Sequence, residues 1–275
     1  MEFNNQVVLI TGAGRGIGAS AARQFAENGA MVVVNDLNAE PAEQVTAEII
    51  SAGGQAISYV GDVTQDGFAK RIVEATIQKY GKLNILVNNA GFTWDAFIHK
   101  ITAEQWQAIM DIHVNAPFKM IQAAAPYMRG AAISEIEDGK TPQNRCVINV
   151  SSTSGLHGNV GQANYATAKS GIVGLTKTIA KEWGPIGVRA NVVAYGYIDT
   201  RLTRAKEDGE AIQVKGEDIA LGIPEKVRQQ LDARVIPLGR AGSAYEAAAG
   251  ILMLASARAS YITGHTLEVT GGFGI

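Results

Sequence analysis

The sequence is almost free of cysteine, with a single residue, Cys146, among 275. One cysteine excludes an internal disulfide and any thiolate metal cluster. The four histidines lack the spacing of metal ligands, and we treat them as ordinary residues. They are His99, His113, His157 and His265. We therefore expect a protein without a bound metal.

The sequence also lacks an excess of either charge and any long apolar run. Its 24 basic and 26 acidic residues nearly balance. No basic run is long enough to follow a phosphate backbone, which argues against a nucleic-acid partner. The opening MEFNNQVVLITG has no basic region of a signal peptide, and no apolar run approaches the roughly 20 residues of a membrane helix. We expect a cytoplasmic protein that does not bind membranes and acts on a small molecule.

Hydrophobic residues make up 47% of the chain and charged residues 18%, which is enough apolar material for one globular domain over residues 1–275. Short β-branched runs alternate with longer helical patterns. This alternation predicts a doubly wound α/β fold, with about seven parallel strands between two layers of helices. The runs are VVLI (7–10), MVVVN (31–35), AISYV (56–60), LNILVN (83–88), CVINV (146–150), VRANVV (188–193) and TLEVT (266–270).

Two segments interrupt the alternation. Residues 130–143 form a polar insertion before the fifth strand, and we interpret them as a surface loop. Residues 200–237 are charged at first and then carry a helical pattern in PEKVRQQLDARV. A long connection after a sheet strand is typical of a lid on the substrate side, and a plain loop is the alternative.

A glycine-rich turn, TGAGRGIG, follows the first strand and leads into a helix. Gly12, Gly16 and Gly18 let the backbone turn sharply and let a pyrophosphate approach the positive end of the helix. The spacing differs from G-x-G-x-x-G because Ile17 stands where the third glycine would be. Glycine turns also occur in strand-to-helix connections that bind nothing. The position of this turn after the first strand is what favours a dinucleotide site.

The choice of dinucleotide depends on the end of the second strand. Asp36 lies 18 residues beyond Gly18, where dinucleotide-binding folds place an acid against the adenosine ribose. A carboxylate accepts hydrogen bonds from both ribose hydroxyls and repels a 2′-phosphate, which favours NAD(H). Arg15 could pair with a 2′-phosphate, so NADP(H) stays open. We include the neighbouring Leu37 in the expected cofactor site.

Two further groups follow the third and fourth strands. Asp62 and Val63 are candidates for holding the adenine amino group, and a helix N-cap is the alternative for Asp62. In VNNAG, the amide of Asn89 can hold backbone in place, while Ala90 and Gly91 leave room for a flat ring. All these groups follow strands, and ligands of open α/β sheets bind at the carboxyl ends of strands.

A polar cluster is expected at the end of the fifth strand. Ser152 ends this strand in INVSSTSG and lies 13 residues before Tyr165, which is followed four residues later by Lys169. Side chains four apart on a helix share a face, so the phenol and the ammonium can reach one point. Taken alone, such a pair could also be two neighbours on a helix surface.

With these motifs, the chain resembles the short-chain dehydrogenase/reductase family in its compact single-domain branch. The matching residues are Thr11 to Gly18, Asp62, Asn88 to Gly91, Asn115, Ser152, Tyr165, Lys169 and the closing TGG at 270–272. The resemblance implies a Rossmann fold, a homotetramer, and hydride transfer between a nicotinamide cofactor and a carbonyl or secondary alcohol. It also implies a catalytic tetrad, which consists of Asn115, Ser152, Tyr165 and Lys169.

The chemistry of carbonyl reduction fits these residue types. The cofactor supplies only a hydride, so the oxygen needs a proton, which Tyr165 can give. A phenol has a pKa near 10, and we expect the nearby Lys169 cation to lower it. Ser152 can hydrogen-bond the substrate oxygen. In the family the lysine also binds the nicotinamide ribose, and Asn115 holds a water that relays protons to it. A plain buried amide is the alternative for Asn115.

One position departs from the family pattern. The family generally has a Pro-Gly pair after the sixth strand, and NVVAYGYIDT has Tyr195 in the proline position. A proline would fix φ and stiffen this turn. The resemblance implies cofactor amide contacts from Ile198 and Thr200, which follow that turn.

The closing segment, from RVIPLGRAG to EVTGG, is similar to reductases of 3-oxoacyl thioesters carried by acyl carrier protein or coenzyme A. The string VVVNDL is similar to NAD-dependent 3-hydroxyacyl-CoA dehydrogenases. The expected substrate is therefore a 3-oxoacyl/3-hydroxyacyl thioester. Two alternatives stay open: an NAD-dependent dehydrogenase of a free secondary alcohol (polyol, diol, sugar or hydroxysteroid), and a catalytically silent dinucleotide-binding scaffold.

Overall fold

The computed structural model describes residues 1–214, 216–231 and 235–274 and contains a parallel sheet in the order β3-β2-β1-β4-β5-β6-β9. All seven strands expected from the sequence are present. Their bounds are β1 (Val7–Ile10), β2 (Met31–Asp36), β3 (Gln55–Val60), β4 (Ile85–Asn88), β5 (Arg145–Ser152), β6 (Val188–Tyr195) and β9 (Thr266–Val269). The order reverses between β1 and β4, which is where ligands bind in doubly wound sheets.

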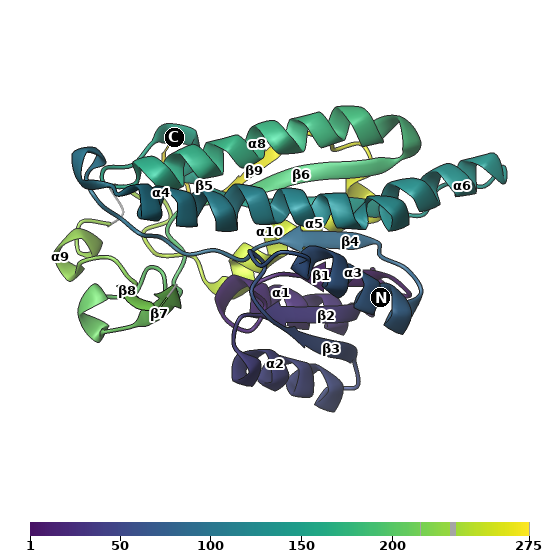
Figure 1. Cartoon of the computed structure of the whole chain (residues 1–275), viewed down its shortest axis with the longest axis horizontal. Coiled ribbons are helices and arrows are strands. Elements are labelled where there is room, and N and C mark those ends of the chain that lie inside the picture. The colour runs from purple at the N-terminus through teal and green to yellow at the C-terminus, as the bar shows by residue number, and fades with distance from the viewer. Residues whose placement is uncertain (215, 232–234, 275) are drawn as a thin grey trace.

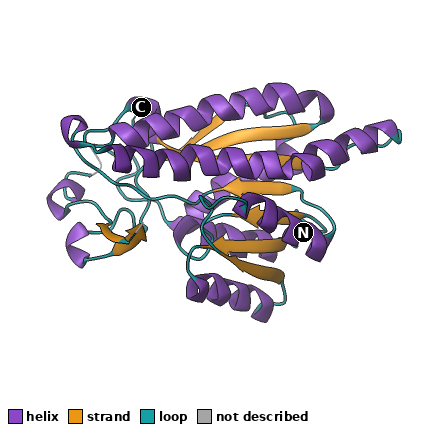
Figure 2. Cartoon of the chain, viewed as in Figure 1, coloured by secondary structure: helices purple, strands orange, loops and turns teal. Residues whose placement is uncertain are grey.

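Helices cover both faces of the sheet (Figures 1 and 2). One layer holds α1 (Gly16–Glu27), α2 (Ala39–Ser51) and α10 (Ala244–Ala255), and the other holds α3 (Phe68–Tyr80), α4 (Ala103–Met110), α5 (Ala116–Ala125) and α8 (Ala163–Trp183). In β1, Val8 and Ile10 pack toward the first layer, while Val7 and Leu9 pack toward the second. Strands covered on both faces need such apolar runs, and the predicted doubly wound fold is confirmed.

Residues 130–143 are partly helical rather than a loop. After α5 the chain continues through a π-helical segment, η3 (Pro126–Gly130), into α6 (Ala131–Glu137), which extends beyond the sheet at the right of Figure 1. The helix forms because its alanine-rich start favours helix and Ala132 is fully buried. Glu135 pairs with Arg145 of β5 at 2.7 Å, which ties α6 to the sheet.

The segment at 200–237 contains a hairpin that the sequence analysis did not anticipate. Strands β7 (Ala211–Val214) and β8 (Glu217–Ala220) pair antiparallel and lie outside the main sheet, at the left of Figure 1. The charged, largely exposed sequence of β8 has low strand propensity, so it gives no strand signal. The helix expected in residues 224–235 covers only α9 (Glu225–Arg228), and residues 232–234 lie outside the described part.

Shorter helices complete the chain. They are η1 (Ile98–Lys100), η2 (Asp111–Asn115), α7 (Thr153–His157), η4 (Gly184–Ile186), η5 (Lys206–Asp208) and η6 (Ala257–Ala259). Within the described ranges, no helix is both long and apolar enough to cross a membrane, and no three His, Cys, Asp or Glu side chains gather as a metal site. Burial raises the pKa of the Cys146 thiol to about 11, which makes it a poor nucleophile.

Candidate active site

The glycine turn after β1 has the backbone geometry of a phosphate site. Gly12 and Gly16 have φ angles of 63° and 54°, in the left-handed region that favours glycine. A Cβ at Gly18 would lie 2.3 Å from the Gly12 carbonyl oxygen, so the helix packs directly on the turn. The first N–H groups of a helix have no intrahelical partner, and the side chain of the N-cap Arg15 does not bond to them. Backbone amides at the start of a helix fit a pyrophosphate.

The end of β4 holds this turn in place. The Asn89 amide donates to the carbonyl oxygens of Thr11 and Gly12, both at 2.9 Å. The Thr11 hydroxyl accepts from the backbone N–H groups of Asn89 and Ala90 at 3.0 and 3.1 Å. The amide of Asn89 therefore holds backbone as expected, while the contribution of Thr11 was missed, although Thr11 stands directly before the first glycine.

Asp36 leans from the end of β2 onto the glycine turn. Its carboxylate accepts hydrogen bonds from the backbone N–H groups of Gly14 and Asn38 at 3.0 and 3.1 Å. Leu37 beside it is exposed, while Ile17 packs partly buried against the core. A carboxylate accepts several hydrogen bonds, so Asp36 retains capacity for ribose hydroxyls.

Asp62, which follows β3, forms hydrogen bonds with a residue two positions further along the chain. Asp62 accepts hydrogen bonds from the backbone N–H and the hydroxyl of Thr64 at 2.8 and 2.7 Å through one oxygen, Oδ1. This is the turn-forming use that a short carboxylate side chain favours. Val63 is buried among the side chains of the α3 layer.

The loop after β6 returns to the glycine turn. The Thr200 methyl carbon would lie 3.6 Å from a Cβ built on Gly16, so this loop and the start of α1 are neighbours. Ile198 is buried and forms an isolated bridge with Gly242. Both residues expected to contact the cofactor amide thus lie at the carboxyl edge of the sheet.

Tyr195, in place of the usual proline, anchors the end of β6. Its side chain is buried, and its hydroxyl donates to the Ala247 carbonyl of α10 at 2.9 Å. Its backbone carbonyl accepts from the Thr153 hydroxyl at 3.3 Å. Side-chain hydrogen bonding therefore fixes the strand end that a proline would stiffen through φ.

Tyr165 and Lys169 lie on the same face of α8, against the end of β5. The Lys169 side chain is buried, its ammonium nitrogen lies 5.6 Å from the centroid of the Tyr165 ring, and it donates to the Val150 carbonyl at 2.7 Å. The Ser151 hydroxyl donates to the Lys169 carbonyl at 2.7 Å. Two hydrogen bonds thus fix this part of α8 on the strand.

Ser152 ends β5 beside this pair. Its hydroxyl oxygen caps α7 by accepting from the Ser154 backbone N–H at 3.2 Å. The nearby Ser152 side chain lowers the pKa of the Tyr165 phenol, but this effect is smaller than that of burial. The structure therefore brings Ser152, Tyr165 and Lys169 together.

Burial dominates the electrostatics of this cluster. It raises the pKa of Tyr165 to about 12 and lowers the pKa of Lys169 to about 7, because both charged forms lose solvation. The expected lowering of the Tyr165 pKa by Lys169 is not observed. At neutral pH the phenol keeps its proton, and Lys169 lies near its own midpoint.

Asn115 does not join this cluster. Its side chain is exposed, and its amide donates to Asp111, one turn earlier, at 2.8 Å. Both residues belong to η2, a π-helical segment between α4 and α5 that shifts the helical register. The segment also buries His113, whose ring meets that of Tyr165 with centroids 5.1 Å apart. The sequence analysis did not single out His113, because helical periodicity assumes 3.6 residues per turn and this segment is a π-helical turn.

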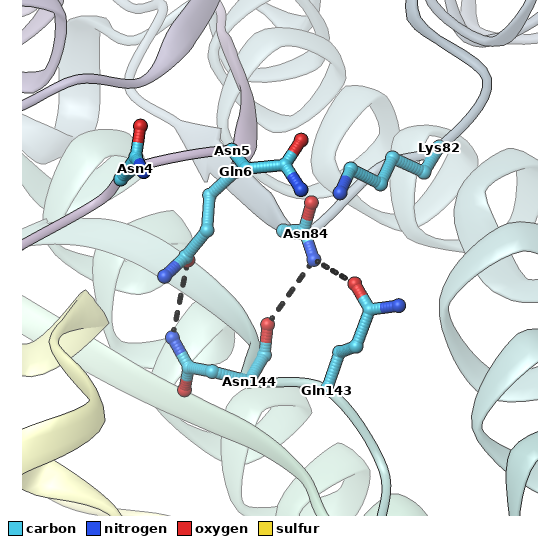
Figure 3. A pocket seen from close by; sticks show the side chains of 7 residues that line it. All are labelled: Asn4, Asn5, Gln6, Lys82, Asn84, Gln143 and Asn144. Atoms are coloured by element: carbon cyan, nitrogen blue, oxygen red, sulfur yellow. Dashed lines mark hydrogen bonds between the residues drawn. The ribbon is translucent and has the colours of Figure 1, made fainter.

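A cavity of about 340 Å³ lies at the other end of the strands, where their amino ends are (Figure 3). Its lining comes from segments that precede β1, β4 and β5 and consists of Asn4, Asn5, Gln6, Lys82, Asn84, Gln143 and Asn144. The amides bond one another: Asn84 donates to Gln143 and to the Asn144 carbonyl, both at 3.4 Å. This cavity is remote from the carboxyl ends of the strands and takes no part in the site.

A parallel sheet with a glycine turn, an acid after β2 and a Tyr-Lys pair at one edge is typical of the nicotinamide-dependent oxidoreductases. A family model described as short chain dehydrogenase matches residues 6–211. The chain therefore belongs to the short-chain dehydrogenase family and is an oxidoreductase.

Curated relatives match the chain over nearly its whole length. A 3-oxoacyl-[acyl-carrier-protein] reductase FabG from Thermotoga maritima is 38% identical over 272 residues, which cover 99% of both chains. A 3-oxoacyl-[acyl-carrier-protein] reductase from Synechocystis is 36% identical and covers 97% of this chain and 96% of its own. The FabG of Escherichia coli is 34% identical over 99% of this chain and 98% of its own.

Proposed function

We propose that this protein reduces the 3-oxo group of a 3-oxoacyl thioester, carried by acyl carrier protein or coenzyme A, with NAD(H) as the preferred cofactor. The observation that carries the proposal is the Tyr165–Lys169 pair on α8, packed against the strand end that bears Ser152. The substrate class is supported by the near full-length similarity to relatives named as 3-oxoacyl-[acyl-carrier-protein] reductases.

Tyr165 is the proton donor in this proposal. The bound nicotinamide supplies the hydride for the carbonyl carbon. The Tyr165 hydroxyl gives its proton to the carbonyl oxygen, and the Ser152 hydroxyl holds that oxygen by a hydrogen bond as charge develops. Lys169 returns a proton to the phenolate. A phenol whose pKa is raised to about 12 carries its proton at neutral pH, which is the form that a proton donor needs.

The cofactor preference rests on Asp36. Its carboxylate, held over the glycine turn by Gly14 and Asn38, would accept from ribose hydroxyls and repel a 2′-phosphate. Arg15 is exposed at the start of α1 and is the residue that would favour NADP(H). The residues that would hold the dinucleotide are Gly12, Arg15, Gly16, Ile17, Gly18, Asp36, Leu37, Asp62, Val63, Asn89, Ala90, Gly91, Tyr165, Lys169, Ile198 and Thr200.

We propose that residues 200–237 form a lid on the substrate side. The Arg228 side chain of α9 donates to the Tyr197 hydroxyl at 3.0 Å, which connects α9 to the loop after β6. Connections of this length beside a site often close over a substrate.

A homotetramer is also proposed, with β9 and α10 at a subunit contact. The reasons are that β9 is an edge strand and that α10 carries exposed apolar side chains.

A spectrophotometric screen tests the proposed substrate. Oxidation of NADH and of NADPH is followed with acetoacetyl-acyl carrier protein, acetoacetyl-CoA and a panel of free ketones. We expect the highest kcat/KM for a thioester with NADH. Turnover confined to free ketones would favour the dehydrogenase of a free secondary alcohol instead. Dinucleotide binding without turnover of any carbonyl would favour the silent scaffold.

A further inference from the structure

The cavity at the amino ends of β1, β4 and β5 has an entirely polar lining (Figure 3). Its volume of about 340 Å³ lies in the range of cavities that hold small ligands. Six carboxamide side chains and one ammonium line it, and no carboxylate stands among these described residues. A lining of this kind suits a small polar molecule that forms many hydrogen bonds.

Asn84 lies at the base of this cavity and is only 1% exposed. Its Oδ1 accepts from the Val7 backbone N–H at 3.0 Å, which holds the start of β1. Its Nδ2 reaches only Gln143 Oε1 and the Asn144 carbonyl oxygen, both at 3.4 Å. These distances exceed the usual range for N–H donors, and buried amides are normally well paired. The Asn84 amide nitrogen can therefore donate to a closer acceptor inside the cavity.

Lys82 gives the cavity a positive charge. It is partly buried, and it forms no ion pair with another described residue. Figure 3 shows its ammonium directed toward the side chains of Asn5 and Asn84. Asn5 has a φ of 59°, in the left-handed region that asparagine adopts more readily than most residues. An ammonium that is partly removed from water and faces only amides is stabilised by an added anion.

The polar atoms left free in the cavity are mainly donors. Hydrogen bonds within the protein already occupy the carboxamide oxygens of Gln6, Asn84, Gln143 and Asn144. The amide nitrogens of Gln6 and Gln143 donate to no described residue, and neither does the Lys82 ammonium. Free N–H donors beside a positive charge match a ligand that is rich in oxygen acceptors.

We propose that this cavity binds a small carboxylate anion with further oxygen acceptors, such as a hydroxycarboxylate or a dicarboxylate. The carboxylate pairs with Lys82 and accepts from Asn84, and the other oxygens accept from Gln6 and Gln143. A single ammonium balances one carboxylate, whereas binding of a planar anion by two parallel bonds or of a phosphate favours arginine. The site lies at the opposite end of the strands from Tyr165, so this proposal does not depend on the proposed function.

Saturation-transfer difference NMR on the full chain tests the proposal, with malate as the probe. Erythritol, a neutral polyol of the same chain length, is the matched comparison. We expect malate to saturate with a Kd on the order of millimolar, as for a small ligand with few contacts. Erythritol should bind at least about 10-fold more weakly, because it has no charge to pair with Lys82. Excess NADH should leave the malate signal unchanged.

Two variants locate the binding. Lys82→Met removes the charge and keeps the length of the side chain, and it should weaken malate binding about 10-fold or more. Asn84→Asp keeps an acceptor for the Val7 N–H but adds a negative charge, and it should abolish the malate signal. Lys79→Met, at an exposed position on α3, is the matched control and should bind malate as the wild-type protein does. If Asn84→Asp does not fold, Lys82→Met decides.

Thermal unfolding gives a second measurement, because a ligand that binds only the folded state raises Tm. Malate should raise the Tm of the wild-type protein more than sodium chloride of equal ionic strength, and this difference should be lost in Lys82→Met. Absence of saturable malate binding, equal binding of erythritol, displacement of malate by NADH, or unchanged binding in Lys82→Met would each overturn the proposal. None of these measurements involves turnover, so they bear on this cavity alone.

Discussion

At the residue scale, Lys169 is a buried group whose charge opposes folding. Burial lowers its pKa from 10.5 to about 7. Below pH 7 the lysine is charged in both the folded and the unfolded chain, and the folded state bears the full desolvation cost. Between pH 7 and 10.5 the unfolded chain binds more protons at this lysine than the folded chain does. The free energy of unfolding therefore rises with pH over this range.

Lys169→Met removes this pH dependence. We expect the free energy of unfolding of the wild-type protein, relative to Lys169→Met, to rise by at most about 1.4 kcal/mol per pH unit from pH 7 to 9. Urea denaturation at several pH values measures it. The matched control is Lys177→Met, an exposed position on the same helix, which should track the wild-type protein. A difference that does not change with pH would contradict the burial argument.

Asp36→Ala tests the cofactor preference. Loss of the carboxylate removes an acceptor for ribose hydroxyls and the repulsion of a 2′-phosphate, so the ratio of kcat/KM for NADH to that for NADPH should fall. One bidentate acceptor of this kind is worth about 1–3 kcal/mol, or roughly 5- to 150-fold in the ratio. Asp62→Ala, which removes the carboxylate after β3, is the control. An unchanged ratio in Asp36→Ala would show that Asp36 does not contact the ribose.

At the scale of elements, the seven strands were predictable because a strand buried on both faces has to be a run of apolar residues. The start of α6 was missed because polar residues around Gly139 suggested a loop. The alanines that begin the helix do not give the alternation of apolar and polar residues by which a helix is predicted from sequence. The β7–β8 hairpin was missed for a different reason, since its exposed, charged residues carry no strand signal.

The site was predictable where spacing decides the geometry. Tyr165 and Lys169 share a face because α8 is a regular helix, and Ser152 follows from the end of β5. Asn115 was misplaced and His113 overlooked because η2 is a π-helical turn, which sequence periodicity does not reveal. His113 can be recognised as part of the site from its tertiary contact with the loop after β4, which the sequence does not reveal.

The attachment of α6 gives a prediction for this element. Arg145 is 3% exposed and forms two hydrogen bonds of 2.7 Å with the Glu135 carboxylate. Glu135→Ala leaves the buried guanidinium unpaired, and we expect it to lower the free energy of unfolding by about 3 kcal/mol. Glu137→Ala, at an exposed position on the same helix, should change it by about 0.5 kcal/mol or less. Similar values for both variants in urea denaturation would contradict this assignment.

At the scale of the whole molecule, the exposed apolar side chains near β9 bear on assembly. Met253 and Tyr245 of α10 are both 64% exposed, and Tyr261 before β9 is fully exposed. Large apolar side chains that are exposed to solvent are often found at subunit contacts, and these three side chains fit the proposed homotetramer.

A homotetramer should have four times the 29.0 kDa mass of the chain in size-exclusion chromatography with light scattering. Met253→Glu should shift the protein toward smaller species, because a charge in an apolar contact is costly. Ile50→Glu, at an exposed apolar position on α2, is the control and should leave the mass unchanged. A wild-type monomer, or a Met253→Glu variant with unchanged mass, would contradict the proposed contact.

The central claim is that Tyr165 delivers the proton in carbonyl reduction. The most direct measurement is the turnover of Tyr165→Phe with acetoacetyl thioester and NADH, together with NADH binding by fluorescence. Phenylalanine keeps the ring packed against His113 and removes only the hydroxyl. We expect kcat to fall roughly 100- to 10,000-fold while the Kd for NADH stays within about twofold of the wild-type value. A Tyr165→Phe variant that keeps wild-type turnover would contradict the account.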